Sequence, residues 1–150
     1  MLNSFTNIIN DVYRLNETTS PNHIDKALTN LAIKSERKQS RICLHKSNKD
    51  PIHIMYICHL KNCKVRIHKH TDFPEWLIFL KAKANILYFN ENGEELKKIR
   101  INTENNSPIF HFIPKDIFHT LKFDDDSFFI EVKQGPFHKE ATDYLFKFQK

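Results

Sequence analysis

The sequence of 150 residues contains very little glycine, with Gly93 and Gly135 as its two examples. Loops that cradle phosphates and turns that bind dinucleotides need glycines at fixed offsets, because a missing side chain lets backbone N–H groups approach the ligand. Neither a G-x-G nor a G-x-x-x-x-G-K pattern is present. The scarcity of glycine therefore excludes P-loop NTPases and dinucleotide-binding enzymes of the Rossmann type.

Long hydrophobic runs and paired cysteines are also missing. No segment approaches the roughly 20 apolar residues of a membrane-spanning helix, and residues 1–10 lack the basic start and apolar core of a secretory signal. The three cysteines, Cys43, Cys58 and Cys63, form no C-x-x-C pair, so we expect reduced, buried thiols rather than a disulfide framework. The sequence therefore predicts a cytoplasmic protein without membrane insertion.

No part of the chain concentrates charge of one sign. The 23 lysines and arginines exceed the 18 acidic residues and give a formal net charge of +5. The lysines are spread among acidic residues, and even the densest basic run, residues 34–41, contains Glu36. We interpret this pattern as a solvated basic surface and predict no nucleic-acid partner.

The hydrophobic content, 40% of the chain with 13 phenylalanines, is enough for the core of one domain. Within residues 1–35, apolar residues recur at spacings of three and four around Val12 and again around Leu28, which predicts an extension of two short helices. From Arg41 onward the period changes to two, which predicts a β-sandwich or barrel over residues 36–150 with a tail packed back on it. The expected strands are residues 42–44, 52–60, 64–68, 76–80, 85–89, 96–101, 109–113, 120–123 and 128–132.

Several histidines have the spacing of metal ligands. His68 and His70 share one face of an extended strand, and Glu75 follows after a turn marked by Pro74, at the start of a strand that we expect to pair antiparallel with the histidine strand. Two imidazoles and one carboxylate suit a divalent transition metal, and His119, after a second turn, could supply a fourth ligand. The alternative interpretation is a solvated strand face that carries histidines by chance.

The same residues resemble the two sequence motifs of the cupin superfamily. Residues 62–82 read N-x5-H-x-H-x4-E-x6-A and residues 108–119 read P-x5-P-x-D-x2-H, with Asn62 and Asp116 at turn positions that are usually glycine in cupins. Asparagine and aspartate tolerate turn conformations better than other non-glycine residues. The resemblance implies a mainly β, antiparallel cupin barrel, also called a double-stranded β-helix or jelly roll. It also implies one metal ion held by His68, His70, Glu75 and His119.

A narrower resemblance covers roughly residues 30–148. The motifs R-x-C-x-H at residues 41–45 and E-x3-G-P-F at residues 131–137 flank the two cupin motifs, and the set in this order is similar to the WbuC-type cupin-fold metalloproteins. This resemblance implies a small bacterial cytoplasmic metalloprotein associated with genes for surface-polysaccharide synthesis. Cupins are commonly dimers, so it also favours a homodimer. Nitrogen and oxygen ligands suit zinc, iron, manganese and nickel alike, which leaves the identity of the ion open.

Strand alternation extends the candidate site beyond the metal ligands. Arg66 shares the face of the two histidines, and Trp76 lies on the outward face of its strand with Ile78 and Leu80, so helices or a second subunit should cover that face. Glu131 and Lys133 share a face as either an acid/base pair or a rim ion pair.

Arg41 and His45 share another face and suit an anionic or sugar-phosphate ligand, or else a salt bridge. His111 either approaches the cavity or has a structural role. The candidate catalytic residues are Glu131 and His45, and the candidate substrate-binding residues are Arg41, Arg66, Lys133 and His111.

The sequence supports three functional hypotheses. The first is a metal-dependent cupin that acts on a small polar molecule, such as a nucleotide-linked sugar, with isomerase-like or epimerase-like chemistry in which the metal is a Lewis acid. The second is an Fe(II) dioxygenase. The third is a metal-dependent binding or sensor module that holds a small molecule without converting it.

Overall fold

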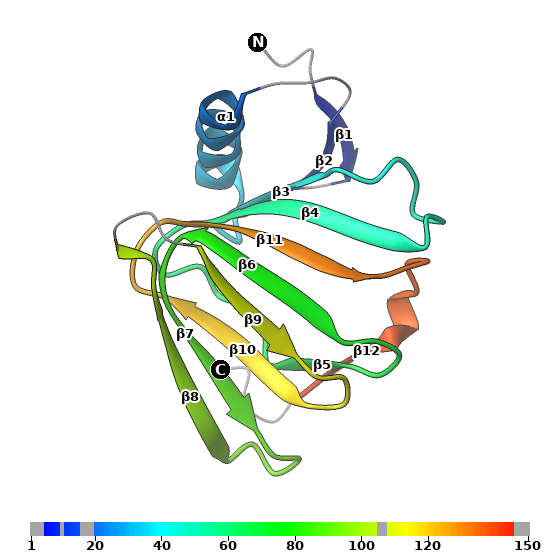
Figure 1. The fold of residues 1–150 in the computed structure, drawn as a ribbon, viewed down its shortest axis with the longest axis vertical. Coiled ribbons are helices and arrows are strands. Elements are labelled where there is room, and N and C mark those ends of the chain that lie inside the picture. The colour runs from blue at the N-terminus through cyan, green and yellow to red at the C-terminus, as the bar shows by residue number, and fades with distance from the viewer. Residues whose placement is uncertain (1–4, 10, 16–19, 105–107, 146–150) are drawn as a thin grey trace.

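The computed structural model describes residues 5–9, 11–15, 20–104 and 108–145, which form two β-sheets and one α-helix (Figure 1). The larger sheet has the strand order β1-β2-β3-β4-β11-β6-β9, and the smaller has the order β12-β5-β10-β7-β8. The elements are β1 (Phe5–Ile9), β2 (Val12–Leu15), α1 (Pro21–Lys34), β3 (Gln39–Cys43), β4 (Ile52–His59), β5 (His68–His70), β6 (Glu75–Lys81), β7 (Lys83–Phe89), β8 (Glu95–Asn102), β9 (Ile109–Ile113), β10 (Phe118–Phe123), β11 (Ser127–Gln134), a 3-10 turn (Lys139–Ala141) and β12 (Thr142–Tyr144).

The main core lies between the two sheets. Ile57, Phe79 and Phe129 come from the larger sheet and Ile86 and Leu121 from the smaller one, and all five side chains belong to one buried cluster. All strand neighbours pair antiparallel except β2 and β3, so the arrangement is the jelly roll that the sequence predicts. The inner faces of the two sheets supply both the core and the cavity described below.

Strand β6 alternates as its sequence predicts. Glu75, Leu77 and Phe79 are buried, whereas Trp76 is 49% exposed. This alternation places the carboxylate of Glu75 on the inner face of the larger sheet, next to the core.

The prediction of a first N-terminal helix, around Val12, is wrong. Residues 5–15 form strands β1 and β2, and Val12 pairs in parallel with Arg41 of β3. A helical spacing over so few residues is a weak signal, and the unpaired edge of β3 offers backbone hydrogen bonds that a short isolated helix would lack. The extension before residue 36 therefore adds two strands to the larger sheet.

The second expected helix is confirmed as α1. Leu28 and Ala32 are fully buried and pack with Ile42 of β3 and with Tyr56 and Cys58 of β4, and Figure 1 shows α1 on the outer side of this sheet. A helix thus covers one end of the outward face.

At the other end of that face, three aromatic side chains stay uncovered. Trp76, Phe110 and Phe112 are 49%, 67% and 41% exposed. The expected homodimer stays a prediction, and these aromatic residues mark the face on which a second copy would lie.

The histidine strand differs from its expected form. Residues 64–67 are irregular, because the carbonyl of Val65 accepts a hydrogen bond from the Thr120 hydroxyl (2.6 Å) and that of Ile67 accepts one from the Leu145 N–H (3.1 Å). The expected pairing with the Glu75 strand is also wrong: β5 pairs with β10 and β12, whereas β6 pairs with β11 and β9. The chain crosses from one sheet to the other between residues 70 and 75.

Two turns confirm the reading of the glycine-poor motifs. Asn62 and Asp116 have φ angles of 66° and 63°, in the left-handed region that glycine usually occupies. The backbone N–H of Asp116 donates to the carbonyl of His70 at 2.8 Å. This turn therefore fixes the start of β10 against the end of β5.

The C-terminal tail returns to the smaller sheet as expected. Strand β12 pairs with β5, and Leu145 is 7% exposed, whereas the predicted contacts of Phe146 and Phe148 lie outside the described residues. All three cysteines are buried and unbridged. Among the described helical residues, none is part of a segment with the length and apolarity to cross a membrane.

Candidate metal centre

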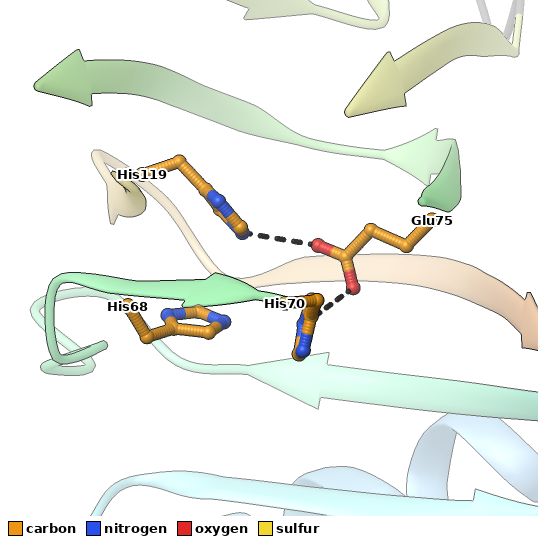
Figure 2. Close-up of side chains that lie close together, drawn as sticks. All are labelled: His68, His70, Glu75 and His119. Carbon is orange, nitrogen blue, oxygen red and sulfur yellow. Dashed lines mark hydrogen bonds and ion pairs between the residues drawn. The ribbon is translucent and has the colours of Figure 1, made fainter. Parts of the chain in front are cut away.

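Four side chains from three strands converge between the sheets. One ligand atom from each of His68, His70, Glu75 and His119 lies within 4.8 Å of the others, and Figure 2 shows the four side chains directed toward one another. His68 on β5 stands directly opposite His119 on β10, and Glu75 reaches the histidines from the facing sheet. All four metal ligands expected from the sequence are therefore brought together.

The carboxylate of Glu75 bridges two of the imidazoles. Its Oε1 lies 3.1 Å from Nε2 of His119, and its Oε2 lies 3.2 Å from Nε2 of His70. Glu75 is 4% exposed and His119 is fully buried. The ring centroids of His68 and His119 are 4.4 Å apart. These buried polar groups satisfy one another across a space into which all four side chains point.

The outer ring nitrogens are held by oxygen atoms. Nδ1 of His68 donates to the carbonyl of Arg66, and Nδ1 of His119 donates to the carbonyl of Ile117, both at 2.9 Å. Nδ1 of His70 lies 3.3 Å from the hydroxyl of Thr142. A carbonyl can only accept, so the bonds of His68 and His119 place a proton on Nδ1. In a neutral ring of this tautomer the lone pair is on Nε2, the nitrogen that faces the cluster. Outer oxygen partners of this kind orient histidines that bind metals.

The electrostatics of the cluster suit a cation. Burial lowers the pKa of His68 to about 4 and keeps its ring neutral. Burial alone would raise the pKa of Glu75, but hydrogen bonds from His119 and His70 hold it well below its usual value. Burial likewise opposes charge on His119, yet the Glu75 carboxylate raises the pKa of that imidazole. The donor set therefore fits a divalent metal, which would take the place of the proton that His119 shares with Glu75.

A cavity of about 220 Å³ adjoins the cluster, and the residues lining it carry an excess of positive charge. Arg37, Arg41, Arg66 and Lys133 line it against two carboxylates, Glu75 and Glu131. Four of the six predicted catalytic and substrate-binding residues therefore meet here: Arg41, Arg66, Glu131 and Lys133.

Lys133 and Glu131 form a close ion pair beside the cluster. Lys133 Nζ lies 2.9 Å from Glu131 Oε1, and both side chains are 13% exposed. Lys133 stands opposite Glu75 in the sheet. Burial disfavours its charged amine, but Glu131 and Glu75 raise the pKa of Lys133. Arg66 is placed differently, since its guanidinium lies 3.8 Å from the centre of the Tyr144 ring.

Neither His45 nor His111 lines the cavity. Strand β3 ends at Cys43, so the alternation that would carry His45 inward stops before it, and its ring stacks on His53 at 4.1 Å. His111 does face inward on β9, but its Nε2 lies 2.7 Å from the Tyr88 hydroxyl. The structure thus separates these two candidates from the cavity.

Gln39 and His59 are among the polar residues of the cavity that the sequence interpretation missed. They stand directly opposite each other on β3 and β4 and are 1% and 5% exposed. Extending the inward alternation of β3 from Arg41 back to Gln39 would have located the pair.

His59 makes the stability of the fold dependent on pH. Burial, together with Arg41 and Arg37, lowers the pKa of His59 well below that of a free imidazole. In the unfolded chain His59 therefore binds a proton near pH 6.5, whereas in the folded chain it stays neutral at that pH. The free energy of unfolding falls as the pH drops below that value, by up to about 1.4 kcal/mol per pH unit.

We expect His59→Phe to reduce this pH dependence by the contribution of His59, because a phenyl ring takes up no proton and can occupy the place of the imidazole between Phe123 and Phe129. Urea unfolding at pH 5, 6 and 7 measures the difference. Parallel pH profiles for the two proteins would contradict the assignment, and His23→Phe, at an exposed position, is the control.

Residues 22–101 match the model of a family described as Domain of unknown function (DUF6016). No curated protein sequence matches the chain. The capsular polysaccharide assembling protein CapF from Staphylococcus aureus has a similar structure, with a TM-score of 0.61 and 17% identity over 73% of this chain and 32% of CapF.

Two oxalate decarboxylases are also similar. The Lactobacillus farciminis protein has a TM-score of 0.50 and 18% identity over 64% of this chain and 27% of its own. The Bacillus subtilis protein, which has Mn(II) centres, has a TM-score of 0.51 and 16% identity over 64% and 24%. The chain thus spans about a third of CapF and about a quarter of the decarboxylases. At these identities the likeness shows the fold alone, and that fold is the cupin-type jelly roll that the sequence predicts.

Proposed function

The chain belongs to the DUF6016 family, and we propose that it binds one divalent transition metal and acts on a small polar, anionic substrate. One observation carries the proposal, the convergence of His68, His70, Glu75 and His119 on one point. The Nδ1 atom of each histidine contacts an oxygen atom, and the Nε2 atoms face the cluster. Zinc, iron, manganese and nickel all suit these ligands.

The charges of the cavity support an anionic substrate. Arg41 and Arg66 would hold its carboxylate or phosphate group, and Lys133 would fix Glu131 beside the reacting carbon. The cavity volume of about 220 Å³ is below that of drug-sized pockets, so a nucleotide-linked sugar would place only its sugar end inside.

The reaction that we favour is an isomerisation or epimerisation. When bound, the metal would polarise a carbonyl or hydroxyl oxygen as a Lewis acid. Glu131 would take the proton from the neighbouring carbon and return it at the product position, while Lys133 holds the carboxylate in place. The proposal extends to surface-polysaccharide metabolism of the WbuC type, in the bacterial cytoplasm, and the likeness to the capsular polysaccharide assembling protein CapF supports this link.

Two alternatives are each favoured by a specific feature. The set of three histidines and one carboxylate also suits Fe(II), so a dioxygenase is the second candidate. Glu131, the proposed base, is engaged in an ion pair with Lys133 at 2.9 Å. A carboxylate held in this way favours a module that binds a small molecule without converting it. Oxygen uptake by the iron-loaded protein would identify the dioxygenase, and recovery of an unchanged ligand after long incubation would identify the binding module.

Elemental analysis of protein purified without added metal tests the proposal. We expect about one equivalent of a transition metal per chain, since three imidazoles and a carboxylate fill four coordination positions. A search by mass spectrometry for small anions that the metal-loaded protein retains or alters then addresses the substrate. Folded protein that contains no transition metal, and takes up none when it is supplied, would falsify the proposed function.

A further inference from the structure

The cavity contains a second group of polar side chains, displaced from the metal cluster along the larger sheet. Gln39 stands opposite His59, and Arg41 stands opposite Ile57, which in turn pairs with Phe129. Glu75 pairs with Lys133, four residues farther along β11. Four residues of extended strand span about 13 Å. The two groups therefore lie on one inner face, at separate positions in the same cavity.

Nitrogen atoms of this second group have no protein partner. Nε2 of Gln39, Nε of Arg41 and both ring nitrogens of His59 are buried without a hydrogen bond. Among the described residues, no carboxylate forms an ion pair with Arg41. The two carboxylates of the cavity have other partners, Glu131 with Lys133 and Glu75 with the histidines. Buried polar groups in proteins are nearly always satisfied. The four unsatisfied nitrogens belong to three residues that all line this cavity, and they therefore indicate a place for a ligand.

The chemistry of the three side chains selects the ligand. The amide nitrogen of Gln39 and the guanidinium of Arg41 can only donate. The ring of His59 is neutral, because burial and the charges of Arg41 and Arg37 lower its pKa, so it offers one donor and one acceptor. Several donors around a fixed positive charge match the oxygens of a phosphate or a carboxylate.

We propose that Gln39, Arg41 and His59 form an anion-binding subsite that holds the phosphate or carboxylate end of the substrate. The inference rests on the proposed function for the identity of the other end, which would lie at the metal cluster. The backbones of the subsite and of the metal cluster are about 13 Å apart along the strand, and the long side chain of Arg41 shortens the distance that a substrate must bridge. The substrate therefore has about the length of a sugar phosphate. Its reacting carbon then lies toward Glu131 and the metal ligands.

Titration with inorganic phosphate and with acetate, at ionic strength matched with chloride, tests the subsite. The probe is the ¹H–¹⁵N signal of the Arg41 Nε–H, assigned by its loss in Arg41→Met. We expect a saturable shift of this signal. A response to phosphate alone identifies a phosphate ester as the substrate class, and a response to acetate alone identifies a carboxylate. A response to both identifies a subsite that binds anions by their charge, whichever of the two groups carries it.

Variants separate binding from folding. Gln39→Leu and His59→Phe should each weaken anion binding by about tenfold or more, because each removes a hydrogen bond to a charged ligand. Neither should lower the melting temperature, since both remove an unsatisfied buried polar group. Arg100→Met, which removes an exposed arginine paired with Asp124 at 3.6 Å, is the control and should leave binding unchanged.

The subsite and the metal centre can fail independently. In the double variant His68→Ala/His70→Ala the anion response should persist although the metal is lost. A wild-type protein that binds anions but takes up no metal would overturn the proposed function and leave the subsite standing. No saturable response to either anion in the wild-type protein would overturn the subsite, whatever its metal content, because buried water would then suffice for the unpaired nitrogens. A response that Gln39→Leu and His59→Phe leave unchanged would also overturn it.

Discussion

Replacing His68 and His70 together with alanine is expected to weaken the binding of a divalent transition metal by on the order of 10⁴-fold. Loss of even an outer partner of a metal ligand costs about 10- to 100-fold in affinity, and this variant removes two direct ligands from one strand. Glu75 and His119 would remain as a hydrogen-bonded pair at 3.1 Å, too few to hold an ion against a chelator. Metal content after dialysis against a graded series of chelator concentrations measures the change.

The matched control for this variant is His111→Ala. His111 also faces inward from a strand, but its nitrogen is bound by Tyr88 and it lies outside the four-residue cluster. Its removal should leave the metal content at about one equivalent per chain. Equal metal affinity in the double variant and the wild-type protein would show that the metal is bound elsewhere.

Glu131→Leu is expected to lower the free energy of unfolding by about 3–5 kcal/mol, because it leaves the buried amine of Lys133 without its partner. The side chains of both residues are 13% exposed, so solvent screens the pair only weakly. Glu75 also stabilises the charge of Lys133, which favours the lower end of the range. A loss of this size is a large part of the total stability of a domain, typically 5–15 kcal/mol. Urea unfolding of the metal-free protein at pH 7 measures it.

The double variant Glu131→Leu/Lys133→Met should recover most of that loss. Replacing both charges with apolar groups of similar size removes the unpaired amine, and such replacements are often neutral or stabilising. A double variant no more stable than Glu131→Leu would show that the unpaired amine of Lys133 is not the cause of the loss. A stable double variant that still binds metal and anions but converts no substrate would assign Glu131 to the chemistry rather than to the fold.

The metal ligands could be predicted because their spacing is local. His68 and His70 need only one extended strand to share a face, and Asn62 and Asp116 mark turns through residue types that accept positive φ. The partner strands could not be predicted in the same way. Glu75 lies only five residues after His70 and yet belongs to the other sheet, because a short connection is equally compatible with a hairpin and with a crossing between sheets.

The remaining differences arise where tertiary contacts decide the local structure. Val12 belongs to a strand because the edge of β3 was open to pairing. Alternation failed at His45 because β3 ends before it. Gln39 and His59 were missed for a different reason, since neither belongs to a recognisable motif. Alternation along β3 could have placed Gln39 on the cavity face, but the unsatisfied nitrogens of the two residues are seen only in the folded structure.

The pairing of β5 with β12 has a consequence for the order in which the protein is made. The three residues of β5 have β10 and β12 as neighbours, and Thr142 stands opposite His70 although it lies 72 positions later in the chain. A growing chain that has left the ribosome only as far as β11 carries all four ligands but lacks the strand that orients His70. Contacts between such distant segments form late in folding. If the cluster binds a metal as proposed, we expect the ion to be captured only after residues 142–144 have been synthesised, so that it would enter a nearly finished fold instead of nucleating it.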